Sequence, residues 1–219
     1  MIARRTFTAL AILALSGLLG LQPVQADMKH MHSDHPLKPL SAQSAKPKSL
    51  DVNILERDLV TQDGDPVKFK SEVIGDKLVI MDFIYTTCTT ACPIQTAMFS
   101  QLQNLLGGRL GKEVSLISIT IDPATDIPSR LKAYAKKHNA GPDWIFLTGK
   151  KSHVDEVLLG LRAYSSDLDE HPSMILVGDG KSDQWTRYYG FPKLDALLSK
   201  LDELQAVRDA HPVSSLGEK

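Results

Sequence analysis

The sequence predicts an α/β fold with a central mixed sheet flanked by helices, and three observations support this prediction. Apolar segments rich in β-branched residues alternate with helical segments along most of the chain, a pattern typical of a sheet covered by helices. The segment 77–86 is apolar on both faces, as a central strand buried on both sides must be. A Gly-rich turn at 178–181 joins two further strand segments, which predicts a closing antiparallel hairpin.

Local patterns predict the individual elements. A β-hairpin is expected where the chain enters the domain, because 51–59 and 67–69 flank a turn sequence at 62–66. A helix is expected from Pro93, which suits a first helical position, to Leu106, where two glycines follow. Periodicity then predicts strand 114–121, helix 128–138 capped by Asp126, strand 144–148, helix 151–164, strands 174–177 and 184–189, and helix 193–207. Together these elements predict a thioredoxin-like fold with an N-terminal β-hairpin.

The first 26 residues are expected to be a signal peptide. Arg4 and Arg5 precede an apolar run at 7–21, and Val24-Gln25-Ala26 is a small-residue cleavage pattern. The apolar run is shorter than the roughly 20 residues that a spanning helix needs, so an uncleaved membrane anchor is the less favoured alternative. The sequence therefore predicts export to the periplasm, with membrane attachment only if the segment 1–26 is retained.

The segment 27–49 is predicted to be a disordered linker, because it is polar and Pro-rich. Its start, 27–35, contains three histidines and two methionines, whose imidazole and thioether groups are ligands that suit copper. A solvated tail without a metal is the alternative for this stretch. The folded domain is expected at 50–207, and 208–219 is expected to be a flexible C-terminal tail.

The charge of the chain argues against nucleic-acid binding. The full chain has a net charge of −1, and cleavage after Ala26 leaves 23 Lys and Arg against 26 Asp and Glu, a net charge of −3. A nucleic-acid-binding protein needs a basic face instead. An exported protein also meets an oxidising environment, in which a close cysteine pair can exist as a disulfide.

Cys88 and Cys92 are the two cysteines of the chain, and they lie where the central strand is expected to meet the following helix. The positive end of a helix dipole lowers the pKa of a cysteine there, and the thiolate is both the nucleophile and the metal ligand. Three intervening residues widen the separation of the sulfurs and permit both to bind one metal. The pair could therefore cycle as a disulfide or hold a soft metal. A purely structural disulfide is less favoured, since so short a loop stabilises little.

A metal site would need a third ligand, and His171 is the candidate. Four histidines lie outside the tail at 27–35. Of these, His138 is expected at a helix C-terminus, and His153 and His211 at the surface. His171 directly precedes the apolar segment 174–177, which is expected to be a central strand. Its loop should therefore approach the two cysteines.

Four sequence blocks, taken together, resemble the Sco/SenC family. They are YTTCTTACP at 85–93, SITIDP at 118–123, WIFLTG at 144–149, and Glu170-His171 ahead of a strand. The resemblance covers 50–207. Members of the family are thioredoxin-like copper-binding proteins that help to assemble the dinuclear copper centre of cytochrome c oxidase.

The resemblance implies that Cys88, Cys92 and His171 are the copper ligands. It also implies a partner, the copper-centre subunit of cytochrome c oxidase or another copper protein, and a role for a dithiol reductant. The chemistry agrees, because two thiolates and an imidazole suit Cu(I) and can hold Cu(II) with an added ligand. Two features depart from the family: Thr89-Thr90-Ala91 separates the cysteines where Pro-Asp is common, and Pro172 follows His171, where ordinary thioredoxins carry a cis-proline facing the dithiol.

Two enzymatic alternatives stay open. A metal-independent thiol–disulfide oxidoreductase would use Cys88 and Cys92 as its catalytic redox pair and would not need His171. A peroxidase of the peroxiredoxin type fits the fold and a cysteine at a helix start, but the sequence lacks the usual peroxidatic pattern. The leading hypothesis is an exported copper chaperone.

Overall fold

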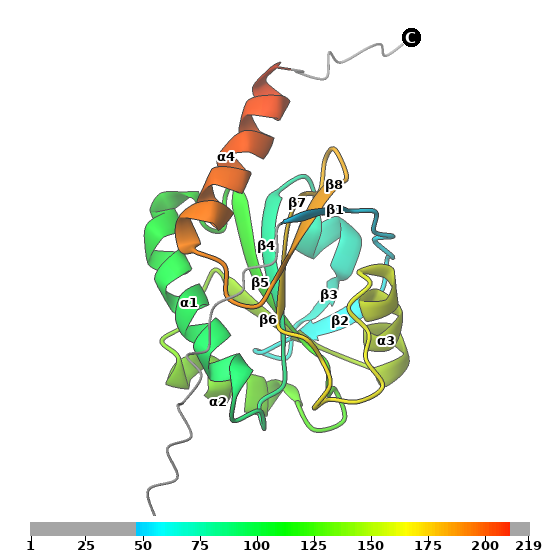
Figure 1. The fold of residues 1–219 in the computed structure, drawn as a ribbon. Helices are drawn as coiled ribbons and strands as arrows, with labels where there is room; N and C mark the ends of the chain where they lie inside the picture. Colours follow the sequence, from blue (N-terminus) through cyan, green and yellow to red (C-terminus); the bar gives the residue numbers. More distant parts are fainter. Residues whose placement is uncertain (1–46, 211–219) are drawn as a thin grey trace, which may run out of the picture. The chain divides into compact units, whose positions relative to one another are not determined.

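A mixed eight-stranded sheet with helices on both faces forms the fold (Figure 1). The computed structural model describes residues 47–210. The strand order is β1-β8-β7-β4-β5-β6-β2-β3. The strands are β1 Lys48–Leu50, β2 Asp58–Thr61, β3 Pro66–Lys68, β4 Leu78–Ile84, β5 Val114–Thr120, β6 Trp144–Thr148, β7 Met174–Asp179 and β8 Gln184–Tyr189. The α-helices are α1 Ala91–Leu106, α2 Pro128–Lys137, α3 Lys151–Gly160 and α4 Leu194–Ala210, with a π-helix at Phe69–Ile74 and a 3₁₀ turn at Gly107–Arg109.

Strand β4 occupies the middle of the sheet, and all seven of its residues are buried. It pairs in parallel with β5, so that Ile84 lies beside Thr120 at the carboxyl ends of both strands. It pairs antiparallel with β7, so that Asp82 lies beside Ile175 near the start of β7. The end of β4, the end of β5 and the start of β7 therefore meet at one edge of the sheet.

Two hydrophobic layers hold the helices on the sheet. Helices α1, α2 and α4 cover one face, where Phe99, Leu131 and Leu201 contribute to a buried cluster with the strands. Helix α3 and the π-helix cover the other face, through residues such as Val157 and Phe69. The helical segments are amphipathic, and the central strands supply apolar side chains to both layers, as the sequence pattern predicts.

The thioredoxin-like fold is confirmed, whereas several predicted boundaries are wrong. The hairpin is β2–β3, and 51–57 is not part of a strand; Asn53 instead donates its N–H to the carbonyl of Gly160, at 2.9 Å. Helix α1 begins at Ala91, before Pro93, because a proline is tolerated anywhere in a first turn whose N–H groups have no helical partner. The predicted signal peptide and most of the predicted linker lie outside the described residues.

The C-terminal helix is longer than the sequence pattern indicated. Helix α4 continues to Ala210, so the predicted tail at 208–219 begins too early. Arg208 explains the extension, because its guanidinium binds the carboxylate of Asp179 at the end of β7, with Nε to Oδ2 at 2.9 Å. The Arg208 guanidinium also donates to the carbonyl of Asp76, at 2.6 Å. Within residues 47–210, no helix is long and apolar enough to cross a membrane.

Arg208 and Asp179 form an ion pair whose acid side chain is 1% exposed. Burial opposes ionisation of Asp179, but the hydrogen bonds from Arg208 and Ser182 outweigh it, and the pKa of this carboxyl is lowered. Removing one partner of a buried pair is costly, because the other charge stays buried without compensation.

We predict that Arg208→Ala lowers the free energy of unfolding by about 2–4 kcal/mol, measured by urea denaturation at pH 7. Arg109→Ala is the matched control, because Arg109 bonds two exposed acids, Glu113 and Asp202. The control should cost less than about 1 kcal/mol. Equal losses in the two variants would show that the pair does not anchor α4.

Candidate metal centre

The two cysteines lie together between β4 and α1. Both are reduced and buried, with Cys88 8% and Cys92 7% exposed. The N–H of Cys92 donates to the sulfur of Cys88 at 3.4 Å, and the Thr90 hydroxyl lies 3.8 Å from the same sulfur. Cys92 is in the first turn of α1. The pair thus lies at a helix N-terminus, as predicted, and the amide of Cys92 also contacts the Cys88 sulfur.

The environments of the two thiols differ. Burial alone would raise the pKa of Cys88, but hydrogen bonds from Cys92 and Thr90 outweigh it and lower this pKa to about 7. Burial raises the pKa of Cys92 to about 12, and the neighbouring Cys88 sulfur adds to the rise. At neutral pH, Cys88 is therefore the thiol that is partly ionised and ready to bind a cation or attack a disulfide.

A hollow of about 490 Å³ opens beside Cys88. The loop from β4 to α1 forms one wall through Tyr85, Thr87, Thr89 and Thr90, and 166–169 forms the other. The second wall ends two residues before His171. This arrangement is consistent with the prediction that the His171 loop approaches the cysteines.

The imidazole of His171 is held elsewhere. Its Nε2 lies 3.0 Å from the carbonyl oxygen of Ala163, and its ring centroid lies 6.1 Å from that of Phe83. Burial lowers the pKa of His171, so the ring is neutral at pH 7 and can donate from Nε2. Across residues 47–210, no three His, Cys, Asp or Glu side chains converge to hold a metal ion. The structure thus brings the two cysteines together, whereas the His171 imidazole is hydrogen-bonded to the carbonyl of Ala163 instead.

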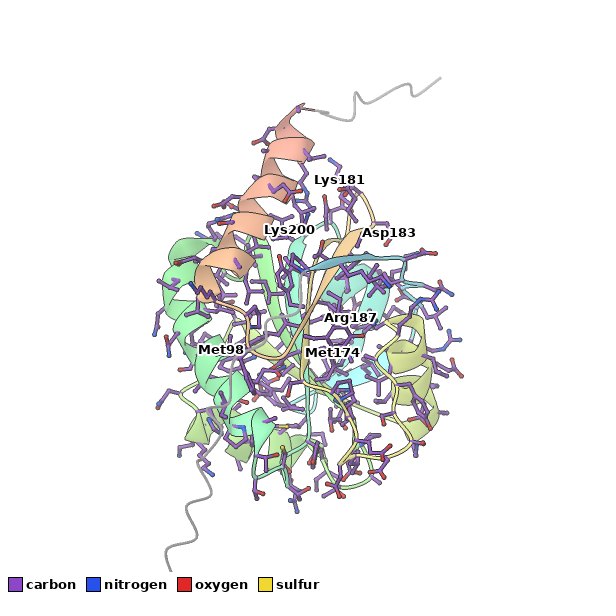
Figure 2. All side chains as sticks on the ribbon, viewed as in Figure 1. Met98, Met174, Lys181, Asp183, Arg187 and Lys200 are labelled. Atoms are coloured by element: carbon purple, nitrogen blue, oxygen red, sulfur yellow. The ribbon has the colours of Figure 1, made fainter. Side chains whose placement is uncertain are left out.

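A polar contact connects the helix of Cys92 to the strand after His171. Gln95, one turn beyond Cys92, is buried and donates from Nε2 to the carbonyl of Met174 at 3.0 Å. Met174 begins β7 (Figure 2). No peptide bond in 47–210 is cis, so Pro172 does not adopt the cis form that the comparison with thioredoxins suggested.

Asp82 is a buried carboxyl that sequence analysis missed. It lies on β4 with no exposed surface, and its Oδ1 accepts a hydrogen bond from Ser118 at 2.5 Å. Its Oδ2 has no hydrogen-bond partner among the described residues. Burial raises the pKa of Asp82 to about 7, although Ser118 and Gln95 oppose the rise. An acidic residue inside the apolar segment 77–86 was the available signal.

Asp126 has a different role from the predicted one. Helix α2 has Ile127 as its N-cap and no side-chain cap, so the prediction that Asp126 caps this helix is wrong. Its carboxylate instead accepts hydrogen bonds from Thr86, just before Cys88, and from Thr120 at the end of β5. No local sequence pattern indicates a contact between residues 40 positions apart.

Fold and site together define a thioredoxin-like protein with a buried, reduced cysteine pair at a helix N-terminus. A family model described as SCO1/SenC matches residues 54–197. The chain therefore belongs to the SCO1/SenC family, as its sequence blocks indicated.

Individual relatives support the assignment. The SCO1 protein homolog of Bacillus subtilis (strain 168) is 37% identical over 100 residues, 45% of this chain and 50% of that protein. The chain thus spans about half the length of this curated relative. The solved structure of BsSco is 26% identical to this chain, with a TM-score of 0.60 over 71% of this chain and 95% of that chain. BsSco is described as having a disulfide switch and as a member of the Sco family of cytochrome c oxidase assembly proteins. Copper-bound ScoI of Bradyrhizobium japonicum shares the fold at 23% identity, with a TM-score of 0.57 over 69% of this chain and 98% of that chain.

The raised pKa of Asp82 predicts a pH-dependent stability. The folded state holds the Asp82 proton up to about pH 7, whereas the unfolded chain loses it near its ordinary value of 3.8. The stability that Asp82 contributes is therefore present at pH 4 and is lost as the pH rises to about 7. We predict that the unfolding free energy of the wild type, relative to Asp82→Asn, falls by about 1–3 kcal/mol between pH 5 and pH 8.

Urea denaturation at several pH values measures this difference. Cys88 and His171 are present in both the wild type and Asp82→Asn, so their contributions to the pH dependence cancel to first order in the difference between the two unfolding free energies. Exchange of the exposed Asp65 for Asn is the control and should give a difference that hardly changes over the same range. A flat difference for Asp82→Asn would contradict the raised pKa.

Proposed function

We propose that this chain is an exported copper chaperone that binds copper through Cys88, Cys92 and His171. The metal is cargo, which passes by ligand exchange to the copper-centre subunit of cytochrome c oxidase or to another copper protein. Membership of the SCO1/SenC family supports the proposal. So do the copper bound in Bradyrhizobium japonicum ScoI and the oxidase-assembly role given for BsSco.

The observation that carries the proposal is the buried, reduced pair next to the His171 loop. The Cys88 sulfur already accepts a hydrogen bond from the Cys92 amide, and such a contact stabilises a thiolate. Two thiolates favour Cu(I), which prefers soft sulfur ligands and a low coordination number. The hollow beside Cys88 gives a metal ion or a partner's side chain access to this sulfur.

The contact with Ala163 suggests which nitrogen of His171 binds. Nε2 donates to a backbone carbonyl, so Nδ1 is left with the free lone pair. A metal-binding histidine commonly donates its other ring N–H to a carbonyl or carboxylate, which fixes the ring and its tautomer. Because no three His, Cys, Asp or Glu side chains converge within 47–210, binding through Nδ1 would require the His171 ring and the two sulfurs to come closer together.

A thiol–disulfide oxidoreductase is the second candidate, and the difference between the two thiols favours it. A thiol with a pKa of about 7 attacks disulfides efficiently at neutral pH, and a neighbouring thiol can then resolve the mixed disulfide. This function would need Cys88 and Cys92 but not His171. Turnover with a dithiol donor that is unaffected by copper chelators would support it.

We predict that the reduced protein binds one Cu(I) and that Cys88→Ala or Cys92→Ala abolishes the tight site. His171→Ala should weaken Cu(I) binding by about tenfold or more, because one of three ligands is lost while both sulfurs stay. Competition with a chromophoric Cu(I) chelator measures these affinities under anaerobic conditions.

His153→Ala is the matched control. His153 lies on α3, where its ring contacts the carbonyl of Asp58 on β2, and both residues line a different hollow. Its affinity should equal that of the wild type. Tight copper binding that survives loss of either cysteine would refute the chaperone site. An unchanged affinity in His171→Ala would leave the cysteines as ligands and exclude His171.

A further inference from the structure

The carboxylate of Asp126 is fully buried and faces the segment that carries Cys88. Its Oδ2 accepts the backbone N–H of Thr86 at 3.0 Å and the Thr120 hydroxyl at 2.7 Å. Its Oδ1 accepts the Thr86 hydroxyl at 2.5 Å. Thr86 therefore donates both its backbone and its side-chain hydrogen to this one carboxylate.

Thr86 lies inside the turn that leads from β4 to the cysteine pair. The N–H of Cys88 donates to the carbonyl of Tyr85 at 3.1 Å, which closes a turn with Thr86 at its second position. On the strand side, the N–H of Ile121 donates to the carbonyl of Ile84 at 2.8 Å. Asp126 thus holds Thr86, which follows the end of β4 and precedes Cys88 by two residues.

A buried carboxylate is costly unless hydrogen bonds compensate for its lost hydration. Among the ion pairs of residues 47–210, none includes Asp126, so neutral donors provide the compensation. Arg130 adds a weaker contact, from Nη2 to the Thr86 hydroxyl at 3.3 Å. Two of the three donor groups at Asp126 belong to Thr86. Asp126 makes these bonds and does not cap helix α2, which begins two residues later.

We propose that Asp126 is a positioning residue that, through Thr86, holds the Cys88 turn so that the Cys88 sulfur meets the Cys92 amide. The proposal deepens the copper-binding function and rests on it. A site whose two sulfurs are already placed loses little conformational freedom when a metal binds. Without the Asp126 contacts, the turn must be ordered during binding, and the affinity for Cu(I) falls.

Three variants separate this role from a general contribution to stability. Asp126→Asn weakens all of the contacts, and Thr86→Val removes the hydroxyl contact within the turn. Thr120→Val removes a hydrogen bond of similar length to the same carboxylate, but outside the turn. Thr86→Ser keeps the hydroxyl and should behave as the wild type.

Cu(I) competition, urea denaturation and hydrogen–deuterium exchange are measured on each variant. We expect Asp126→Asn and Thr86→Val each to weaken Cu(I) binding by about tenfold, and the double variant to lose no more than Asp126→Asn alone. Exchange within 85–92 should accelerate by about tenfold in both, while exchange in β7 should stay unchanged. Thr120→Val should lower the stability with less than about a threefold change in affinity.

Effects that add in the double variant, or a loss of affinity in Thr120→Val equal to that in Thr86→Val, would overturn the proposal. So would unchanged exchange within 85–92. If Asp126→Asn does not fold, Thr86→Val still decides the outcome. If the wild type binds no Cu(I), the copper function fails by itself, and the exchange data, which need no metal, still test the positioning.

Discussion

The double pairing of β4 is the constraint on which the rest of the structure depends. Strand β4 bonds to β5 on one side and to β7 on the other, and helices cover both faces of the sheet, so all seven of its residues are buried and the cysteine pair lies beyond its carboxyl end. The parallel register brings Thr120 beside Ile84, and the antiparallel register brings the start of β7 to the same edge. Three segments that are distant in the sequence therefore lie at the same edge of the sheet. They are the Cys88 turn, Asp126, which bonds to Thr86 in that turn, and the loop before His171.

At this edge, hydrogen bonds and burial give the two sulfurs different properties. The Cys88 sulfur accepts a hydrogen bond from the Cys92 amide and its pKa is lowered to about 7, whereas burial and the Cys88 sulfur raise the pKa of Cys92 and keep it protonated. The same asymmetry suits stepwise capture of a soft cation and stepwise disulfide exchange. His171 distinguishes these two chemistries, because exchange between sulfurs does not need an imidazole. Its bond to Ala163 leaves one ring nitrogen available for a metal.

Periodicity and residue type were enough to predict the central strands, the thioredoxin-like fold and the cysteine pair at the start of α1. Periodicity and residue type did not predict features that depend on contacts between residues far apart in the sequence. The extension of α4 depends on Arg208 reaching Asp179, and the site of Asp126 depends on Thr86, 40 positions away. Asp82 was hidden in an apolar segment, where the Ser118 hydroxyl on the neighbouring strand helps to satisfy it. The position of His171 before a central strand and the family resemblance predict it as a ligand, and no local pattern could reveal its bond to Ala163.

Copper K-edge X-ray absorption of the Cu(I)-loaded protein, compared with His171→Ala, tests the central claim most directly. We predict that two sulfurs and one nitrogen bind the copper in the wild type. In the variant, the nitrogen should be lost while both sulfurs remain. A wild-type spectrum with a sulfur-only shell that does not change in His171→Ala would contradict the three-ligand site. A shell without sulfur would contradict the assignment of the cysteine pair as the copper site.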